Sequence, residues 1–251
     1  AINLTQAQGP WIELKKQFEK KGWSVVTWLE VLERKIQPDF VFHLAAQALV
    51  RPSYETPVET MMINSIGSAN LLDTLRQLDK PVIAVMITSD KAYDNVEWVW
   101  GYRETDKLGG KDPYSASKGM AELAIRSFVE SFFNTPDSNV RVGITRAGNV
   151  IGGGDWATDR IVPDCMVAWS NSEVVDIRSP DATRPWQHVL EPLSGYLSLG
   201  AALSINGDYH GEAYNFGPQS HQNYSVRNLI NEMEMHWTSV RWNDVSQSQH
   251  H

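Results

Sequence analysis

The sequence predicts an α/β protein in which a doubly wound parallel sheet carries a second, smaller domain. Three observations favour this class. Short apolar runs alternate with segments of helical periodicity up to about residue 150. Small or polar residues directly follow three of these runs, and the pattern loosens after Gly154. We expect one domain at 1–150 plus about 189–216, and a second at about 151–188 plus 217–251.

The first half of the chain contains the clearest elements. The stretch 11–21 has helical periodicity with Gly22 as C-cap, and a helix covering 31–37 stops before Pro38. Apolar runs predict buried strands at 39–43, 81–88 and 140–146, whereas amphipathic spacing predicts helices at 57–78 and 114–133. Residues 92–113 form a loop rich in Trp, Gly and Asp.

The second half is predicted from weaker patterns. Helices are expected at 160–170, 191–205 and 225–237, the last capped by Ser225. Short strands are expected at 174–178 and 213–216. Residues 184–189 form a compact polar and aromatic cluster between elements.

Composition excludes several function classes. The 251 residues carry a net charge of −8 with no basic stripe, so we expect neither nucleic acid nor a membrane surface as partner. Cys165 is the single cysteine, and the seven histidines show no metal-ligand spacing, so no metal site is expected. No apolar run approaches the roughly 20 residues of a membrane span. A cytoplasmic enzyme fits these features. The chain begins at Ala1 without Met and stops at His251, so we expect residues beyond both ends.

Two short pieces at one predicted sheet edge point to chemistry. Ser89, Asp90 and Lys91 follow the apolar run 81–87 and present a hydroxyl, a carboxyl group and an amine. Tyr114 and Lys118 lie four residues apart, which places them on one face of a helix. There the ammonium favours the ionised phenol electrostatically. Ligands bind at the carboxyl ends of parallel strands, so the two pieces together predict a redox and proton-transfer site.

These residues resemble the extended short-chain dehydrogenase/reductase family. The resemblance is carried by 43–46 (His-Leu-Ala-Ala), Asn64, Ser89, the Tyr114–Lys118 pair and 146–150 (Arg-Ala-Gly-Asn-Val), in this order and spacing. Ser89-Asp90-Lys91 resembles the signature of nucleotide-sugar 4,6-dehydratases. The stretches 93–114 and 184–196 resemble the branch that acts on CDP-glucose, and the similarity covers about 37–251.

The resemblance implies a Rossmann-like fold, NAD as cofactor and CDP-glucose as substrate. It implies that Tyr114 takes the C4 hydroxyl proton, that Lys118 supports the phenolate and that Ser89 binds the C4 oxygen. Lys91 then removes the C5 proton, and Asp90 protonates the leaving C6 hydroxyl. The implied cofactor contacts are Ala45, Ala46, Gln47, Asn64, Thr88, Tyr114, Lys118 and Arg146. The implied substrate contacts are Asn149, Arg160, Arg184 and His188.

The resemblance also implies a homodimer or homotetramer assembled through the helices at 57–78 and 114–133. The product would serve dideoxysugar and lipopolysaccharide biosynthesis. One family feature is absent, because 22–24 (Gly-Trp-Ser) does not supply the Gly-rich phosphate loop that follows the first strand.

Alternatives remain open at the level of single residues. Tyr93 could replace Lys91 as the C5 base, and Lys91 could instead form a plain salt bridge with Asp90. His43 follows a strand, and packing is favoured over catalysis there. Trp98 and Trp100 could line the substrate pocket or simply pack the loop.

Two other functions compete with dehydration. An epimerase or reductase would use Tyr114 and Lys118 without elimination, but Asp90 and Lys91 beside Ser89 argue against it. A non-catalytic chain that binds a sugar nucleotide or a partner subunit is favoured only by the missing Gly-rich loop.

Overall fold

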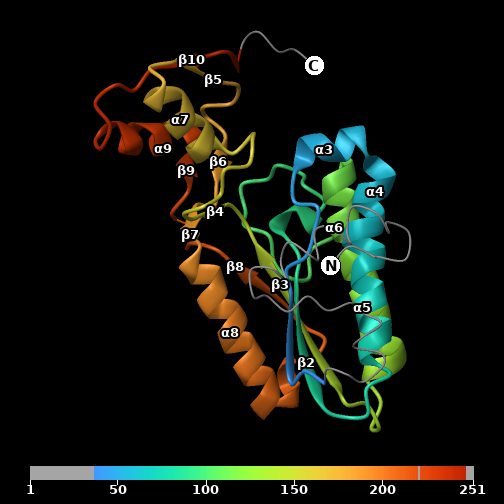
Figure 1. Ribbon diagram of the computed structural model, residues 1–251. Coiled ribbons are helices and arrows are strands. Elements are labelled where there is room, and N and C mark those ends of the chain that lie inside the picture. Colours follow the sequence, from blue (N-terminus) through green and yellow to red (C-terminus); the bar gives the residue numbers. More distant parts are fainter. Residues whose placement is uncertain (1–36, 220, 247–251) are drawn as a thin grey trace, which may run out of the picture. The chain divides into compact units, whose positions relative to one another are not determined.

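The computed structural model describes residues 37–219 and 221–246 (Figure 1). The expected helix at 11–21, its cap Gly22, the sequence 22–24 and nearly all of 31–37 lie outside this part of the chain. The described residues fall into two compact units. The first comprises the residues up to Ala147 together with Ser194–Phe216, and the second comprises Gly148–Leu193 and the residues from Gly217 onward.

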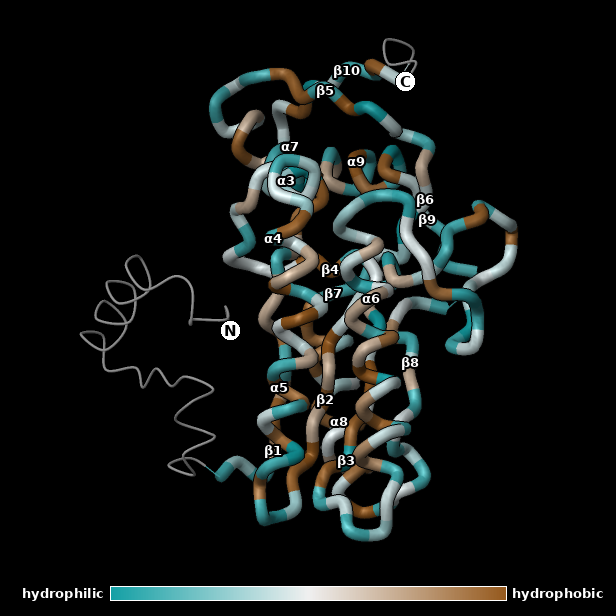
Figure 2. The backbone as a smooth tube through the Cα atoms, turned by 90° about the vertical axis from the view of Figure 1, so that its right-hand side faces the viewer, coloured by the Kyte–Doolittle hydropathy of each residue, from teal (hydrophilic) through white to brown (hydrophobic). Residues whose placement is uncertain are grey.

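The first unit is built on a parallel sheet in the order β1-β2-β3-β8. Its strands are β1 (Phe40–His43), β2 (Val82–Ile87), β3 (Val140–Ala147) and β8 (Ala213–Phe216). All four predicted strands of this unit are confirmed to within one or two residues. Hydrophobic residues follow one another along β2 (Figure 2) because this strand is covered on both faces. The parallel register places the carboxyl ends of the strands at one edge.

One face of this sheet is covered by the helices α4 (Pro57–Met61), α5 (Gly67–Leu75) and α6 (Pro113–Phe128), with α3 (Val50–Glu55) leading into α4 (Figure 1). A π-helical turn, Met62–Ile66, joins α4 to α5, and a second one, Val129–Phe133, extends α6. The predicted helix at 57–78 is therefore wound in three segments, and α3 was not predicted. Leu71, Leu72 and Ile125 pack against Val142 and Ile144 in the core of this face.

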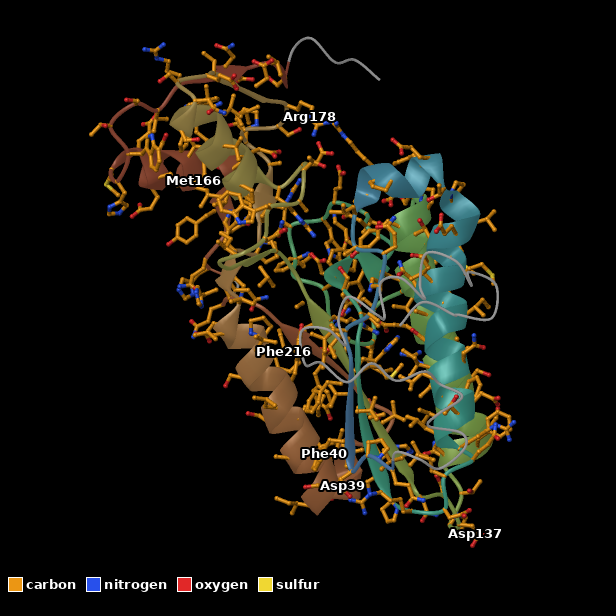
Figure 3. All side chains as sticks on the ribbon, in the orientation of Figure 1. Asp39, Phe40, Asp137, Met166, Arg178 and Phe216 are labelled. Carbon is orange, nitrogen blue, oxygen red and sulfur yellow. The ribbon has the colours of Figure 1, made fainter. Side chains whose placement is uncertain are left out.

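The opposite face is covered by α8 (Leu190–Ile205). Gly143 of β3 faces Leu199 and Leu203 of this helix, because an added Cβ there would lie 2.8–2.9 Å from their methyl carbons. Phe216 ends β8 beside α8 (Figure 3), and its ring meets Tyr196 edge-on at 5.5 Å. Helices on both faces of a parallel sheet confirm the predicted fold class of this unit.

The second unit contains α7 (Ile161–Ser170), α9 (Val226–Glu234) and short strand pairs. Its core gathers Cys165, Trp169, Ile177, Val226 and Ile230. Ser225 caps α9 in a capping box with Asn228, as the sequence predicts. The strand pairs are β4 (Val150–Ile151) with β7 (Gln187–His188), β5 (Val175–Ile177) with β10 (Trp242–Asp244), and β6 (Thr183–Arg184) with β9 (Tyr224–Ser225). Among the described residues, no helix is long and apolar enough to cross a membrane.

Candidate active site

The turn that follows β2 brings the predicted acid and base groups to the carboxyl edge of the sheet. Asp90–Ala92 form one 3-10 turn, and Ser89 caps it by accepting a hydrogen bond from the Lys91 backbone N–H at 3.2 Å. The Ser89 hydroxyl donates to the Asp90 carboxylate at 3.0 Å. Two of the five predicted catalytic groups are therefore in direct contact at the tip of β2.

Tyr114 and Lys118 occupy the first two turns of α6. The helix begins at Pro113, and Asp112 caps it by accepting from the Ser115 N–H at 2.9 Å and the Ser115 hydroxyl at 2.6 Å. Tyr114 and Lys118 are both buried, at 8% and 6% exposure, on the inward face of the helix. The predicted pair is thus held on a rigid, well-capped element.

Lys118 has an unusual environment for an amine. Burial lowers the pKa of Lys118 from 10.5 to about 8, and the nearby Glu122 carboxylate opposes this shift. Among the described residues, no side chain or carbonyl accepts a hydrogen bond from its ammonium. The structure therefore offers a buried amine with unused donors next to Tyr114.

The Asp90–Ala92 turn packs directly against α6. A Cβ at Gly119 would lie 2.8 Å from the carbonyl oxygen of Gly109 and 3.4 Å from that of Ala92. The Gly109 N–H also donates to the Ala92 carbonyl at 2.9 Å. The close approach at Gly119 therefore seats the turn immediately beside Lys118.

A buried ion pair lies beneath the turn. Glu122 of α6 binds Arg146 of β3 through both carboxylate oxygens, and both residues are 1% exposed. Arg146 also donates to the Tyr93 hydroxyl at 2.7 Å and to the Glu104 carbonyl at 2.9 Å. The Thr88 hydroxyl donates to Glu122 at 2.6 Å. Glu122 was not predicted, although a Glu four residues after Lys118 on a buried helix face was a readable signal.

This network changes the interpretation of three predicted residues. The guanidinium of Arg146 is occupied by Glu122, Tyr93 and Glu104, which favours a structural role over a cofactor contact. The Thr88 hydroxyl is likewise bound within the protein. Tyr93 donates its own proton to Asn215 at 2.7 Å, and burial raises its pKa, so its geometry argues against the alternative that Tyr93 is the C5 base.

The segment after β1 is fastened to α6 through Asn64. This amide accepts from the Gln47 N–H at 2.8 Å and donates to the Gln47 carbonyl at 3.0 Å and the Ser117 hydroxyl at 2.8 Å. The Gln47 side chain donates to Leu49 and Thr60 in turn. Asn64 and Gln47 thus use their side chains to place the backbone at Ala45 and Ala46, which are half-buried.

His43 and Lys91 differ sharply in burial. His43 is buried with Nε2 3.3 Å from the Ser68 hydroxyl, and burial lowers its pKa to about 4. This placement agrees with the packing role preferred from the sequence. Lys91 is exposed. Within the described part of the chain it forms no ion pair with Asp90, which argues against the alternative of a plain salt bridge.

The four predicted substrate contacts lie in the second unit, whereas Tyr114 lies in the first. The backbone carbonyl of Asn149 accepts from the Gln187 N–H at 3.1 Å, which places this residue beside β7 and His188. Arg184 on β6 is half-buried, and Arg160 precedes α7 and lies 3.6 Å from Asp155. The Nε of Arg160 and the indole Nε1 of Trp186 are both buried without a hydrogen-bond partner among the described residues.

Comparison with known proteins identifies relatives along most of the chain. Residues 26–199 match the GDP-mannose 4,6 dehydratase family. The chain is 49% identical over 206 residues to a CDP-glucose 4,6-dehydratase of Salmonella typhimurium, covering 81% of this chain and 57% of that protein. It therefore spans little more than half the length of this relative.

Solved structures share the fold at lower identity. A dTDP-glucose 4,6-dehydratase double mutant from Streptomyces venezuelae with NAD and DAU bound has a TM-score of 0.70 at 20% identity, covering 89% of this chain and 66% of that one. A UDP-glucuronic acid 4-epimerase from Bacillus cereus, in complex with UDP-glucuronic acid and NAD, has a TM-score of 0.75 at 18% identity, covering 94% and 74%.

Proposed function

The chain belongs to the GDP-mannose 4,6 dehydratase family, and we propose that it carries out the NAD-dependent conversion of CDP-glucose to CDP-4-dehydro-6-deoxyglucose. The observation that carries this proposal is the packing of the Ser89–Lys91 turn against the helix of Tyr114 and Lys118. An epimerase needs only the latter pair, whereas elimination needs an acid and a base as well. The 49% identity to a CDP-glucose 4,6-dehydratase supports the same choice.

The described residues fit a dinucleotide at this edge of the sheet. The buried ammonium of Lys118 has donors without acceptors, which suits the hydroxyl groups of a ribose. The backbone at Ala45 and Ala46, placed by Asn64, lies at the carboxyl end of β1 where such ligands bind. When bound, NAD would supply the hydride acceptor that makes C4 a ketone.

The residues then divide the proton transfers between them. Tyr114 as phenolate takes the proton of the C4 hydroxyl, and the Lys118 cation stabilises that phenolate. Ser89 holds the C4 oxygen by a hydrogen bond. A ketone at C4 acidifies the neighbouring C–H, so Lys91 removes the C5 proton and Asp90 protonates the C6 hydroxyl, which leaves as water. Return of the stored hydride to C6 and of a proton from Lys91 to C5 would then give the 6-deoxy product and regenerate NAD.

Substrate binding is assigned to the second unit. Arg160 and Arg184 supply cations for the pyrophosphate, while Asn149 and His188 supply polar contacts. The buried indole Nε1 of Trp186, two residues from both Arg184 and His188, supports this assignment, because a buried donor without a partner is costly unless a ligand satisfies it.

Self-association is also part of the proposal. Large apolar side chains are exposed along α4, the π-helical turn and α6, which suits a helical interface between two copies: Val58, Met62, Ile66, Met120 and Leu123. The setting we propose is the cytoplasm, with the product feeding dideoxysugar synthesis for lipopolysaccharide.

The test is to incubate the protein with NAD and CDP-glucose and to search by mass spectrometry for a product lighter by one water. Parallel reactions contain GDP-mannose, dTDP-glucose and UDP-glucose, and Asp90→Asn is the matched inactive control. Water loss from CDP-glucose alone is expected. An isomerised CDP-sugar of unchanged mass would indicate the epimerase, and binding without turnover would indicate the non-catalytic alternative.

A further inference from the structure

The turn that carries Ser89, Asp90 and Lys91 is flanked by Thr88 and Tyr93, and both of these residues are bound to one buried ion pair. Thr88 precedes the turn and donates its hydroxyl proton to Glu122 at 2.6 Å. Tyr93 follows the turn and accepts from Arg146 at 2.7 Å, with the guanidinium 4.6 Å from the centre of its ring. Glu122 and Arg146 bind each other through both carboxylate oxygens.

The ion pair joins α6 to β3, and Thr88 and Tyr93 connect it to the turn. Glu122 lies one turn after Lys118 on α6, and Arg146 lies at the carboxyl end of β3, next to the strand from which the turn emerges. Tyr93 continues the chain of hydrogen bonds to Asn215 on β8. One continuous set of hydrogen bonds therefore connects the turn, α6, β3 and β8.

We propose that the Glu122–Arg146 pair is a positioning device that fixes Ser89, Asp90 and Lys91 relative to Tyr114 and Lys118. This inference rests on the proposed function for its catalytic meaning. Elimination needs the acid and the base within hydrogen-bonding reach of a sugar that Tyr114 already holds. A small rotation of the turn away from α6 removes that reach without disturbing Tyr114 or Lys118.

The geometry favours positioning over simple stabilisation. A buried ion pair adds little net stability compared with well-packed apolar side chains, because desolvation offsets the attraction. It does impose direction, since a guanidinium offers its donors in a fixed planar fork. Here that fork is shared between a helix carboxylate and the hydroxyl of Tyr93, which stands directly after the turn.

Two variants remove the flanking hydroxyls and leave the ion pair in place: Tyr93→Phe and Thr88→Val. Each has a matched control elsewhere in the same unit. Tyr196→Phe removes a buried phenol hydroxyl on the other face of the sheet, and Thr74→Val removes the hydroxyl of a buried threonine that bonds within α5.

The first readout is backbone hydrogen exchange of the turn, which needs neither ligand nor activity. The Ala92 N–H is bonded to the Ser89 carbonyl at 3.0 Å, and the Gly109 N–H is bonded to the Ala92 carbonyl at 2.9 Å. In Tyr93→Phe and Thr88→Val, these amides are expected to exchange about tenfold faster, the factor for one lost bond to a charged group. Amides of α5 and β2 should be unchanged, and the two control variants should leave the turn unchanged.

The second readout is the isotope effect on dehydration. With deuterium at C5 of CDP-glucose, the effect on turnover is expected to increase in both variants, because proton removal by the displaced turn becomes slower. With deuterium at C4, the effect should decrease. A variant that merely folds less well would lower turnover and leave both isotope effects at their wild-type values.

Unchanged exchange at the turn in both variants would overturn the positioning role, as would unchanged isotope effects in an active enzyme. If the protein dehydrates no sugar nucleotide, the proposed function fails. The exchange measurement still decides whether the pair fixes the turn.

Discussion

Glu122 follows Lys118 by one turn of α6, yet its carboxylate is bound to Arg146 and not to the lysine ammonium. The arginine thus holds the carboxylate of an acidic side chain that would otherwise lie within one helical turn of the Lys118 amine without a partner of its own. Lys118 keeps its donors for a ligand as a result, and burial rather than pairing determines its pKa.

Breaking this ion pair from one side is expected to be costly. Glu122→Gln leaves the Arg146 cation buried without its counter-charge, which should lower the free energy of unfolding by roughly 3–5 kcal/mol in urea titrations. The double variant Glu122→Leu/Arg146→Met removes both charges and should recover most of that loss. A double variant as unstable as the single one would contradict the electrostatic explanation.

Lys118 should make the stability depend on alkaline pH. Its pKa is about 8 in the folded protein and 10.5 ordinarily, so between these values the unfolded chain binds more protons. Stability from this group therefore rises as pH increases from 8 to 10.5, by roughly 3 kcal/mol in total. Lys118→Met should lack this rise when the two proteins are unfolded in urea across that range, and parallel curves would contradict it.

His43 should make the stability of the fold decrease at acidic pH. Its pKa is lowered to about 4 from 6.5, so the unfolded chain binds the proton more readily between these values and the fold loses stability as pH falls through them. His43→Asn is expected to flatten this loss in thermal melts. The exposed His236→Asn should retain the wild-type slope.

A single methyl group at Gly119 should separate the turn from α6. Alanine normally stabilises a helix relative to glycine by about 1 kcal/mol. At Gly119 the new Cβ would lie 2.8 Å from a backbone carbonyl, so we expect Gly119→Ala to destabilise the protein and reduce turnover. Gly67→Ala on α5 meets only an atom at 3.8 Å and should be neutral or stabilising. Equal melting temperatures for the two variants would refute the close approach.

The sequence predicted those features that depend on local spacing. Tyr114 and Lys118 share a helix face by periodicity alone, and the strands at 82–87 and 140–147 are long apolar runs. The two-residue strands of the second unit are too short to show the alternation of apolar and polar residues that identifies a strand. The π-helical turn at Met62–Ile66 is likewise hidden, because a one-residue widening leaves the apolar pattern of the helix nearly intact.

The interpretation of charged residues required the structure. An arginine at the end of a strand has the same sequence pattern whether it binds a phosphate or a buried glutamate, so local sequence does not distinguish the cofactor contact that the resemblance implies for Arg146 from its bond to Glu122. The sequence leaves Tyr93 open as an alternative base to Lys91, since the bond from its hydroxyl to Asn215 joins residues 122 positions apart. Long-range partners of this kind leave no trace in local sequence.

The late pairing of β8 with β3 has a consequence for synthesis on the ribosome. β1, β2 and β3 emerge first, and residues 148–212 must be translated before β8 can cover the outer edge of β3. At about 5–20 residues per second this takes several seconds. During that interval the nascent chain presents an unpaired strand edge, which is a template for aggregation. Premature termination anywhere in 148–212 is therefore expected to yield insoluble fragments, and the fold depends on translation reaching Phe216.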